Sequence, residues 1–184
     1  MATSPPKGPI PYYVGPTPST AFENVMSAGA QLDELVELPG VNTLYCHLGK
    51  KASGTALYCE DAALRSCNLV VGPAYKIWLM VHPDDSEKLE KLVRRYGAMT
   101  DCGQAVCHLN LFLPPSVLEQ ACIRFEVIVA GQTDLVVTRP RQYHLIVHFT
   151  DCLAVSINYL YPGEPVFPED MTPTATPDFA RWEA

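Results

Sequence analysis

The sequence lacks the features that identify membrane-spanning, secreted and zinc-ribbon proteins. No apolar run in its 184 residues approaches the roughly 20 residues that a membrane helix needs. The first residues, Met-Ala-Thr-Ser-Pro-Pro-Lys, do not have the charged and then apolar layout of a signal peptide. Seven cysteines are present without a CxxC pair, and their odd number indicates reduced thiols in the cytosol or nucleus. We therefore expect a protein that is neither secreted nor inserted in a membrane.

Basic residues are also scarce. The chain has 13 Lys and Arg against 20 Asp and Glu, which gives a net charge of -7. This balance opposes a surface that neutralises nucleic-acid phosphates, and it suits either an ordinary soluble surface or a basic partner such as a peptide tail. With 48% hydrophobic residues the chain is not disordered, and its length corresponds to one domain with a single core.

Prolines gather at the two ends of the chain. Six of the 17 prolines lie within the first 18 residues, and five lie from Pro162 onward. This distribution predicts a Pro-rich N-terminal arm over residues 1–19, a core domain over residues 20–160 and a Pro-rich C-terminal tail over residues 161–184.

The core is predicted to be mainly β, with few helices. A capping-box pattern at Thr20 predicts a helix that runs to about Leu38, and a clearer helix is predicted from Asp84 to Tyr96. A short third helix is expected after Pro115. Short β-branched or aromatic segments bounded by Gly, Pro or Asp predict strands at 41–48, 55–59, 67–71, 75–81, 124–129, 135–138, 143–149 and 153–160. Many short strands with few helices favour a sandwich or a double-sheet barrel.

Two distant segments contain candidate metal ligands. Tyr58 and Glu60 are two residues apart, so on a strand both side chains leave the same face, and His144 opens another apolar strand. A carboxylate and an imidazole from two strands can meet inside a small barrel, where Fe(II) sites use two His and one carboxylate. The spacing alone leaves a plainer alternative open, namely a surface glutamate and a hydrogen-bonded core histidine.

Several further segments complete a pattern that extends over about residues 40–160. They are Gly40-Val-Asn-Thr43, Tyr45, Gly49, Tyr58-Cys-Glu-Asp61, Asn68, Lys76-Ile-Trp78, Cys102, His108, Pro115-Ser-Val-Leu118, Tyr143-His144 and Ser156-Ile-Asn158. Together they resemble the JmjC domain of histone-lysine demethylases, most closely the branch that also carries a JmjN segment. The resemblance implies a double-stranded β-helix, a jelly-roll or cupin-like barrel, with a few flanking helices. It also implies Fe(II) and 2-oxoglutarate as cofactors, and hydroxylation of an N-methyl group that leaves as formaldehyde.

The resemblance assigns the iron ligands to Glu60, His144 and the position of Tyr58, where the family has histidine. A phenol has a pKa near ~10 and must lose its proton before it ligates a metal well, so this departure weakens an Fe(II) site. Two alternatives remain. Tyr58 is either an atypical ligand, or its ring fills the emptied metal cavity.

The resemblance also assigns the 2-oxoglutarate pocket. Lys76 and Asn68 match family residues, and a buried ammonium suits a dicarboxylate. Phe22 stands near the place of a tyrosine hydroxyl, and Thr55 replaces a stacking aromatic ring. A plain alternative for Lys76 is a lysine whose stem packs beside Trp78.

The methyl-lysine pocket and a zinc site are each matched in part. Gly40, Ser156 and Asn158 match substrate-binding residues of the family, while His47 replaces a tyrosine and makes a poorer partner for a methylammonium group. Three zinc ligands are possible, namely Cys102, Cys107 and His108. A structural zinc site needs four ligands, so this set is incomplete.

These observations support two competing hypotheses. The first is a nuclear, chromatin-associated pseudo-demethylase that binds a histone tail or another chromatin protein as a scaffold module. The second is an active Fe(II)- and 2-oxoglutarate-dependent demethylase or protein hydroxylase with an atypical Tyr58. A metal-free cupin-like dimer or interaction domain is a third possibility, and the oligomeric state is left open.

Overall fold

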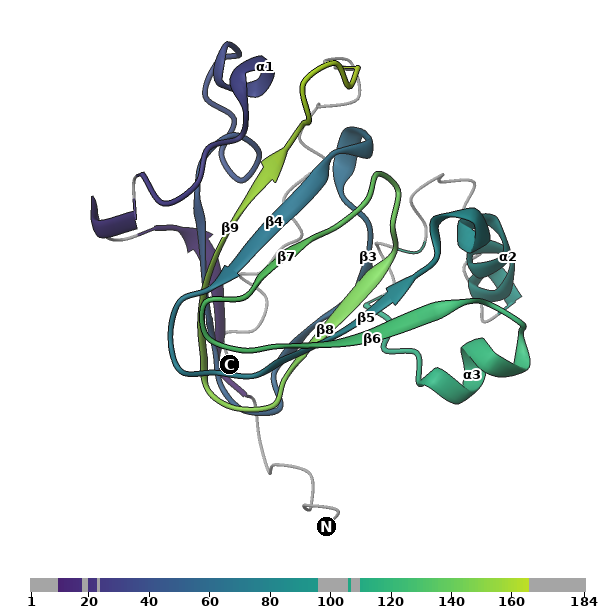
Figure 1. The fold of residues 1–184 in the computed structure, drawn as a ribbon. Coiled ribbons are helices and arrows are strands. Elements are labelled where there is room, and N and C mark those ends of the chain that lie inside the picture. Colours follow the sequence, from purple (N-terminus) through teal and green to yellow (C-terminus); the bar gives the residue numbers. More distant parts are fainter. Residues whose placement is uncertain (1–9, 18–19, 23, 96–105, 107–109, 166–184) are drawn as a thin grey trace.

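The computed structural model describes residues 10–17, 20–22, 24–95, 106 and 110–165, and it contains two antiparallel sheets that face each other (Figure 1). The larger sheet has the order β1-β2-β9-β4-β7 and the smaller one β3-β8-β5-β6. Their bounds are β1 Tyr12–Pro16, β2 Tyr45–Gly49, β3 Gly54–Tyr58, β4 Arg65–Val70, β5 Lys76–Val81, β6 Phe125–Ala130, β7 Leu135–Val137, β8 His144–His148 and β9 Cys152–Tyr159. Because the chain passes repeatedly from one sheet to the other, this is a jelly-roll, and the mainly β prediction is confirmed.

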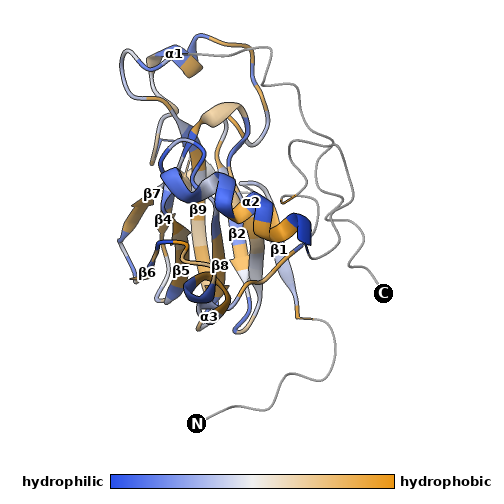
Figure 2. Cartoon of the chain, turned by 90° about the vertical axis from the view of Figure 1, so that its right-hand side faces the viewer, coloured by the Kyte–Doolittle hydropathy of each residue, from blue (hydrophilic) through white to orange (hydrophobic). Residues whose placement is uncertain are grey.

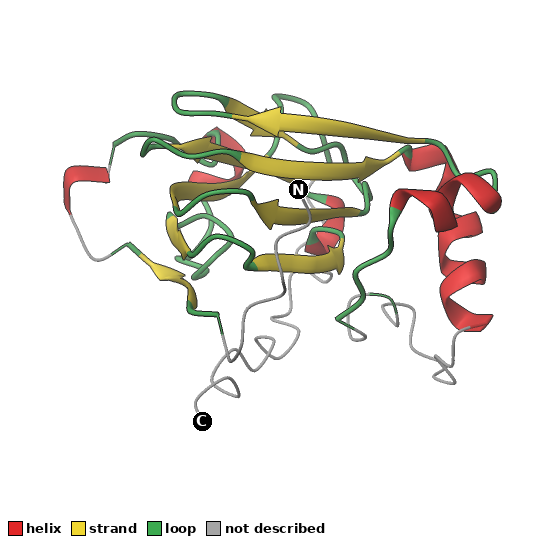
Figure 3. Cartoon of the chain, turned by 90° about the horizontal axis from the view of Figure 1, so that it is seen from below, coloured by secondary structure: helices red, strands yellow, loops and turns green. Residues whose placement is uncertain are grey.

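Short helical elements lie at the ends of the strands. They are α1 Ala30–Asp33, α2 Ser86–Arg95 and α3 Pro115–Gln120, with the 3-10 turns η1 Thr20–Phe22, η2 Asp61–Ala63 and η3 Pro83–Asp85. Seen from below, α2 and α3 lie together at one end of the sheets (Figure 3). None of the helices in the described residues is long and apolar enough to span a membrane.

Alternation along β5 assigns its side chains to two of the three core clusters that the described residues form. Trp78 and Met80 face the space between the sheets and pack with residues of both sheets, such as Ile146 and Ala154. Leu79 and its neighbours on the opposite face form a second cluster beneath α2 and α3, with Leu57, Val81, Leu89, Val93, Leu118 and Leu145. Helix α2 carries both hydrophobic and hydrophilic residues, as an amphipathic covering helix should (Figure 2).

The predicted segments agree with the structure except near the N-terminus. α2, α3 and all eight predicted strands are present, although β2 begins at Tyr45 rather than at residue 41. The long helix predicted over residues 20–38 is wrong, because only η1 and the four-residue α1 form there. Gly29 precedes α1 with φ 91°, and a Cβ at this position would lie 2.9 Å from the Leu160 carbonyl oxygen. The backbone conformation at Gly29 therefore separates the two short elements.

Strand β1 was not predicted, because it lies in the segment assigned to an N-terminal arm. It pairs antiparallel with β2 from Tyr12↔Gly49 to Pro16↔Tyr45 and forms the outer strand of the larger sheet. An outer strand tolerates proline, since the missing N–H can face away from the ladder. The many prolines of this segment therefore led to the prediction of an arm, where the chain forms a strand that brings Tyr12 to the barrel.

The cluster beneath α2 generates a stability prediction. Leu89 is fully buried between α2 and the smaller sheet. Leu89→Ala should lower the free energy of unfolding in urea by about 2–5 kcal/mol, because it removes buried surface and leaves a cavity. The matched change Val36→Ala, at a side chain that is 78% exposed, should alter it by less than about 0.5 kcal/mol. Equal effects of the two changes would contradict this packing.

Candidate metal and cosubstrate site

The pairing of β3 with β8 brings the three candidate metal-site residues together. The register places Tyr58 opposite His144, after a shift between Thr55 and Tyr58 that indicates a β-bulge. The two rings are 4.3 Å apart between centroids and tilted by 57°. Glu60 follows β3, and its Oε1 lies 3.6 Å from His144 Nε2.

Burial keeps both groups of the Glu60–His144 contact uncharged over part of the pH range. Burial raises the pKa of Glu60 to about 7, even though the Asn158 amide donates a hydrogen bond to its Oε2 at 3.2 Å. Burial also lowers the pKa of His144 to about 4. Between these values the carboxyl group is protonated and the imidazole is neutral. The contact is therefore not an ion pair at mildly acidic pH.

The orientation of His144 is that of a metal ligand. Its Nδ1 lies 2.9 Å from the backbone oxygen of Gln142, which can only accept, so Nδ1 carries the proton and Nε2 has a free lone pair. Within the described part of the chain, neither His144 Nε2 nor Glu60 Oε1 has a hydrogen-bond partner. Their separation of 3.6 Å is too long for a hydrogen bond between them.

The donor set nevertheless does not fit the iron centre of two imidazoles and one carboxylate. The third position is Tyr58, whose ring lies tilted against that of His144 and whose hydroxyl hydrogen-bonds to the Glu60 side chain. Among the described residues, no group of three His, Cys, Asp or Glu side chains is placed to hold one metal ion. Two donors alone do not complete the facial triad.

Lys76 is the most deeply buried charged group in the barrel. Its side chain is fully buried, and its Nζ donates to Asn68 Oδ1 at 2.7 Å and lies 5.2 Å from the centroid of the Trp78 ring. Burial lowers the pKa of Lys76 from 10.5 to about 8. A neutral amide and an aromatic ring compensate an ammonium only in part, so the position is suited to an anionic group.

A hydrogen-bonded network that includes Tyr12 occupies the neighbouring interior. Tyr12 Oη lies 2.9 Å from Thr55 Oγ1 and 3.2 Å from His47 Nδ1. His47 Nε2 lies 2.7 Å from Ser156 Oγ. Burial is the main reason that the pKa of His47 is well below its usual value, so its imidazole is neutral. Residues that the resemblance assigns to cosubstrate and substrate binding thus bond to one another.

His148 was not predicted as a site residue. Its Nδ1 lies 2.8 Å from Ser53 Oγ, and its ring meets Tyr12 edge-on at 5.1 Å between centroids. Gly49 leaves the room for this ring, because a Cβ there would overlap His148 Nδ1. The sequence signal was its place on the strand that begins at His144, where positions 144, 146 and 148 share the inward face.

The remaining predicted residues lie at different distances from this interior. Asn158 contacts Glu60, as described above, whereas Gly40 lies in the loop before β2 and its N–H donates to Thr43 Oγ1 at 3.1 Å. Phe22 belongs to η1, outside both sheets, whereas Tyr12 places a tyrosine hydroxyl beside Thr55. Cys102, Cys107 and His108 lie outside the described residues.

The two facing antiparallel sheets define a class, the cupin-like jelly-roll barrels. A family model described as "JmjC domain, hydroxylase" matches residues 45–159, from β2 to β9. The chain is also 31% identical over 152 residues to the Probable lysine-specific demethylase 4F of Homo sapiens, a match that covers 78% of this chain and 24% of the relative. The chain therefore spans about a quarter of the length of that relative. The chain belongs to the JmjC domain family, whose members generally use Fe(II) and 2-oxoglutarate.

The buried ammonium of Lys76 predicts a distinctive dependence of stability on pH. Its pKa is lower in the folded protein than in the unfolded chain, so the cost of burying the charge is fully present below about pH 8 and disappears as pH rises to about 10.5. The stability of Lys76→Met relative to wild type should therefore fall by on the order of 3 kcal/mol between neutral pH and this upper limit. Urea unfolding of both proteins at several pH values between neutral pH and about 10.5 measures this difference in stability.

Lys91→Met is the matched control, since the Lys91 side chain is 73% exposed. Its stability relative to wild type should hardly change with pH over the same range. A difference for Lys76→Met that is independent of pH would show that Lys76 is not buried as an ammonium.

Proposed function

We propose that this JmjC domain has lost the dioxygenase reaction and acts as a nuclear pseudo-demethylase, a binding or scaffold module for a histone tail or another chromatin protein. The observation that carries the proposal is the contact of Tyr58 with His144, at 4.3 Å between ring centroids. Tyr58 stands at the sequence position to which the resemblance assigns a second imidazole. Without that imidazole the donor set has no facial triad.

The interior polar network supports the same proposal. Tyr12, Thr55, His47 and Ser156 satisfy one another's hydrogen bonds in a continuous chain. A cosubstrate or a methyl-lysine group that entered here would have to break these bonds before it made its own. His47 is also neutral and buried, so it interacts with a substrate cation more weakly than a tyrosine ring would.

The proposed partner follows from the relative and from charge. The relative is named as a lysine-specific demethylase, which associates this family with methylated lysine. The net charge of -7 on the present chain favours a basic partner such as a histone tail. A domain that has lost the reaction can keep such a surface, because binding and chemistry depend on different residues.

One observation favours the alternative, an active dioxygenase. Glu60 Oε1 and His144 Nε2 face each other without other partners in the described structure, and Lys76 remains buried nearby. In an active protein Glu60 and His144 would hold Fe(II) and Lys76 would bind the far carboxylate of 2-oxoglutarate. The bound iron would supply the oxidation chemistry of the family.

Titration calorimetry with chelator-stripped protein separates the two candidates. We expect no heat from 2-oxoglutarate with wild-type protein, whether or not Mn(II) is present as a stand-in for Fe(II). Tyr58→His should restore a second imidazole and raise Mn(II) affinity by at least about tenfold. Tyr58→Phe is the matched control, because it keeps the ring, removes the hydroxyl and supplies no imidazole.

The outcomes have distinct meanings. Mn(II)-dependent binding of 2-oxoglutarate to the wild type would overturn the pseudo-demethylase proposal. A gain in metal affinity without 2-oxoglutarate binding in Tyr58→His would locate the remaining defect in the Tyr12–His47 network. Fluorescein-labelled histone-tail peptides should bind the wild-type chain equally well with and without EDTA.

A further inference from the structure

The two sheets have open edges that lie next to each other in the chain. β6 is the end strand of the smaller sheet and β7 the end strand of the larger one, and residues 131–134 connect them. In the described part of the chain, β6 pairs only with β5 and β7 only with β4. Figure 1 shows the two strands diverging from their connecting turn. Unpaired strand edges are potential sites for the addition of another strand.

The hydrogen-bond pattern identifies which backbone groups are free on β6. His82 N–H donates to the Arg124 carbonyl at 2.9 Å, so this pair is of the hydrogen-bonded type. Antiparallel pairs alternate, and the register continues through Val81↔Phe125, Leu79↔Val127 and Ile77↔Val129. The N–H and C=O groups of Phe125, Val127 and Val129 therefore point away from β5. By the same alternation, Leu135 and Val137 point their backbone groups away from β4.

These edges also expose apolar side chains. Val127, Val129 and Leu135 are 53%, 58% and 52% exposed. Proteins usually protect an edge strand with lysine, proline or a bulge, whereas β6 has only one charged residue, Glu126. An apolar edge with free backbone groups and little protection is suited to a guest strand.

A groove of about 450 Å³ lies beside the β6 edge. Its apolar lining comes from β5, β6 and β7, and comprises Met80, Phe125, Ile128, Leu135, Val136 and Val137. A strand added to β6 would direct alternate side chains into this groove and the others over Val127 and Val129. The guest should therefore be apolar on both of its faces.

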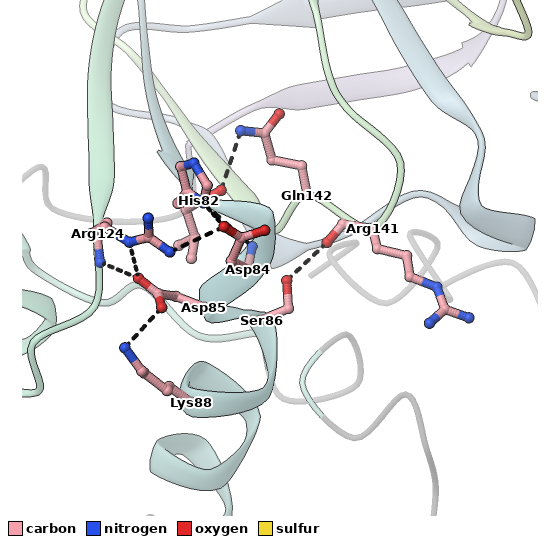
Figure 4. Close-up of polar contacts among 9 residues, drawn as sticks. His82, Asp84, Asp85, Ser86, Lys88, Arg124, Arg141 and Gln142 are labelled. Carbon is pink, nitrogen blue, oxygen red and sulfur yellow. Dashed lines mark hydrogen bonds and ion pairs between the residues drawn. The ribbon is translucent and has the colours of Figure 1, made fainter.

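The charged residues at one end of the groove determine where a guest strand would carry a charge of its own. His82, Arg124 and Arg139 lie there, near the start of β6, while Glu126 is the one acidic residue that lines it. Arg124 is held by Asp84 and Asp85, as Figure 4 shows. Arg139, by contrast, has no ion pair among the described residues, and its backbone N–H is capped by Gln142 Oε1 at 2.9 Å. An added carboxylate would meet Arg139 and be repelled by Glu126 further along.

The start of β6 is rigidly placed. Asp85 Oδ2 accepts from the Arg124 backbone N–H at 3.0 Å and from its Nε at 2.8 Å, and Lys88 Nζ lies 2.9 Å from Asp85 Oδ1 (Figure 4). Arg124 is the main reason that the pKa of Asp85 is far below its usual value. The edge is therefore ordered before any guest arrives, which lowers the entropy cost of binding.

We propose that the β6 edge and its groove bind an extended peptide segment of a partner protein, which adds antiparallel to β6. The segment has apolar residues along its length and an acidic residue at its C-terminal end, where it meets Arg139. The lining of the groove does not include Glu60, His144 or Lys76, so the proposal does not depend on the loss of the dioxygenase reaction. A histone tail, being basic, is not its guest.

The test uses the full chain and a fluorescein-labelled synthetic peptide of alternating valine and leucine that ends in aspartate. Fluorescence anisotropy should show saturable binding. Val127→Pro removes an N–H that faces away from β5, so the fold tolerates it, and it should weaken peptide binding by about tenfold. Val127→Thr keeps the N–H and should stay within about twofold of wild type.

Arg139→Glu provides a second, independent variant. It should lower the affinity for the peptide that ends in aspartate by about fivefold. It should raise the affinity for the same peptide ending in lysine. Equal binding by Val127→Pro and Val127→Thr, or the same response of both peptides to Arg139→Glu, would overturn the proposal. Elution of the wild type as a dimer that Val127→Pro converts to a monomer would also overturn it, by showing that a second copy occupies the edge.

Discussion

The pairing of β3 with β8 is the constraint on which the candidate site depends. Its register sets Tyr58 opposite His144, and the shift after Thr55 determines which side chains of β3 enter the barrel. A slip by one residue would turn Tyr58 to the outer face and leave His144 without its stacking ring. The backbone thus delivers three side chains to one place, as a metal centre requires. The identity of one of them, rather than any distortion of the strands, is what leaves the donor set incomplete.

Much of the fold was predictable from local patterns. The strands that later form β5 and β8 are short, β-branched and bounded by turn residues, and α2 has clear start and stop signals. The failures occurred where tertiary contacts decide the outcome. β1 forms because it pairs with the edge of β2. No local pattern within a proline-rich stretch predicts that pairing. The expected helix over residues 20–38 fails at Gly29, whose conformation is set by the packing of the chain against Leu160.

The sequence named part of the candidate site, but not the contacts that connect it. Tyr58, Glu60 and His144 were found by spacing and resemblance, and the structure brings them together. The link from Tyr12 to His47 was not foreseeable, because it joins the missed strand to β2. The interior consequently has two regions. Around Tyr12 most polar groups bond to one another, and His148 Nε2 is the exception. Around His144 the described structure leaves His144 Nε2, Trp78 Nε1 and Glu60 Oε1 unpaired. A buried unpaired group lowers stability, so the second region is the one that ligand binding would stabilise.

The close approach of Gly49 to His148 couples the residues that these two positions can accept. Any side chain at position 49 would collide with the imidazole, so the two positions are not free to change independently. A chain with alanine at position 49 must carry a smaller or differently oriented residue at position 148. The absence of one methyl group on the larger sheet therefore limits which residues the smaller sheet can carry.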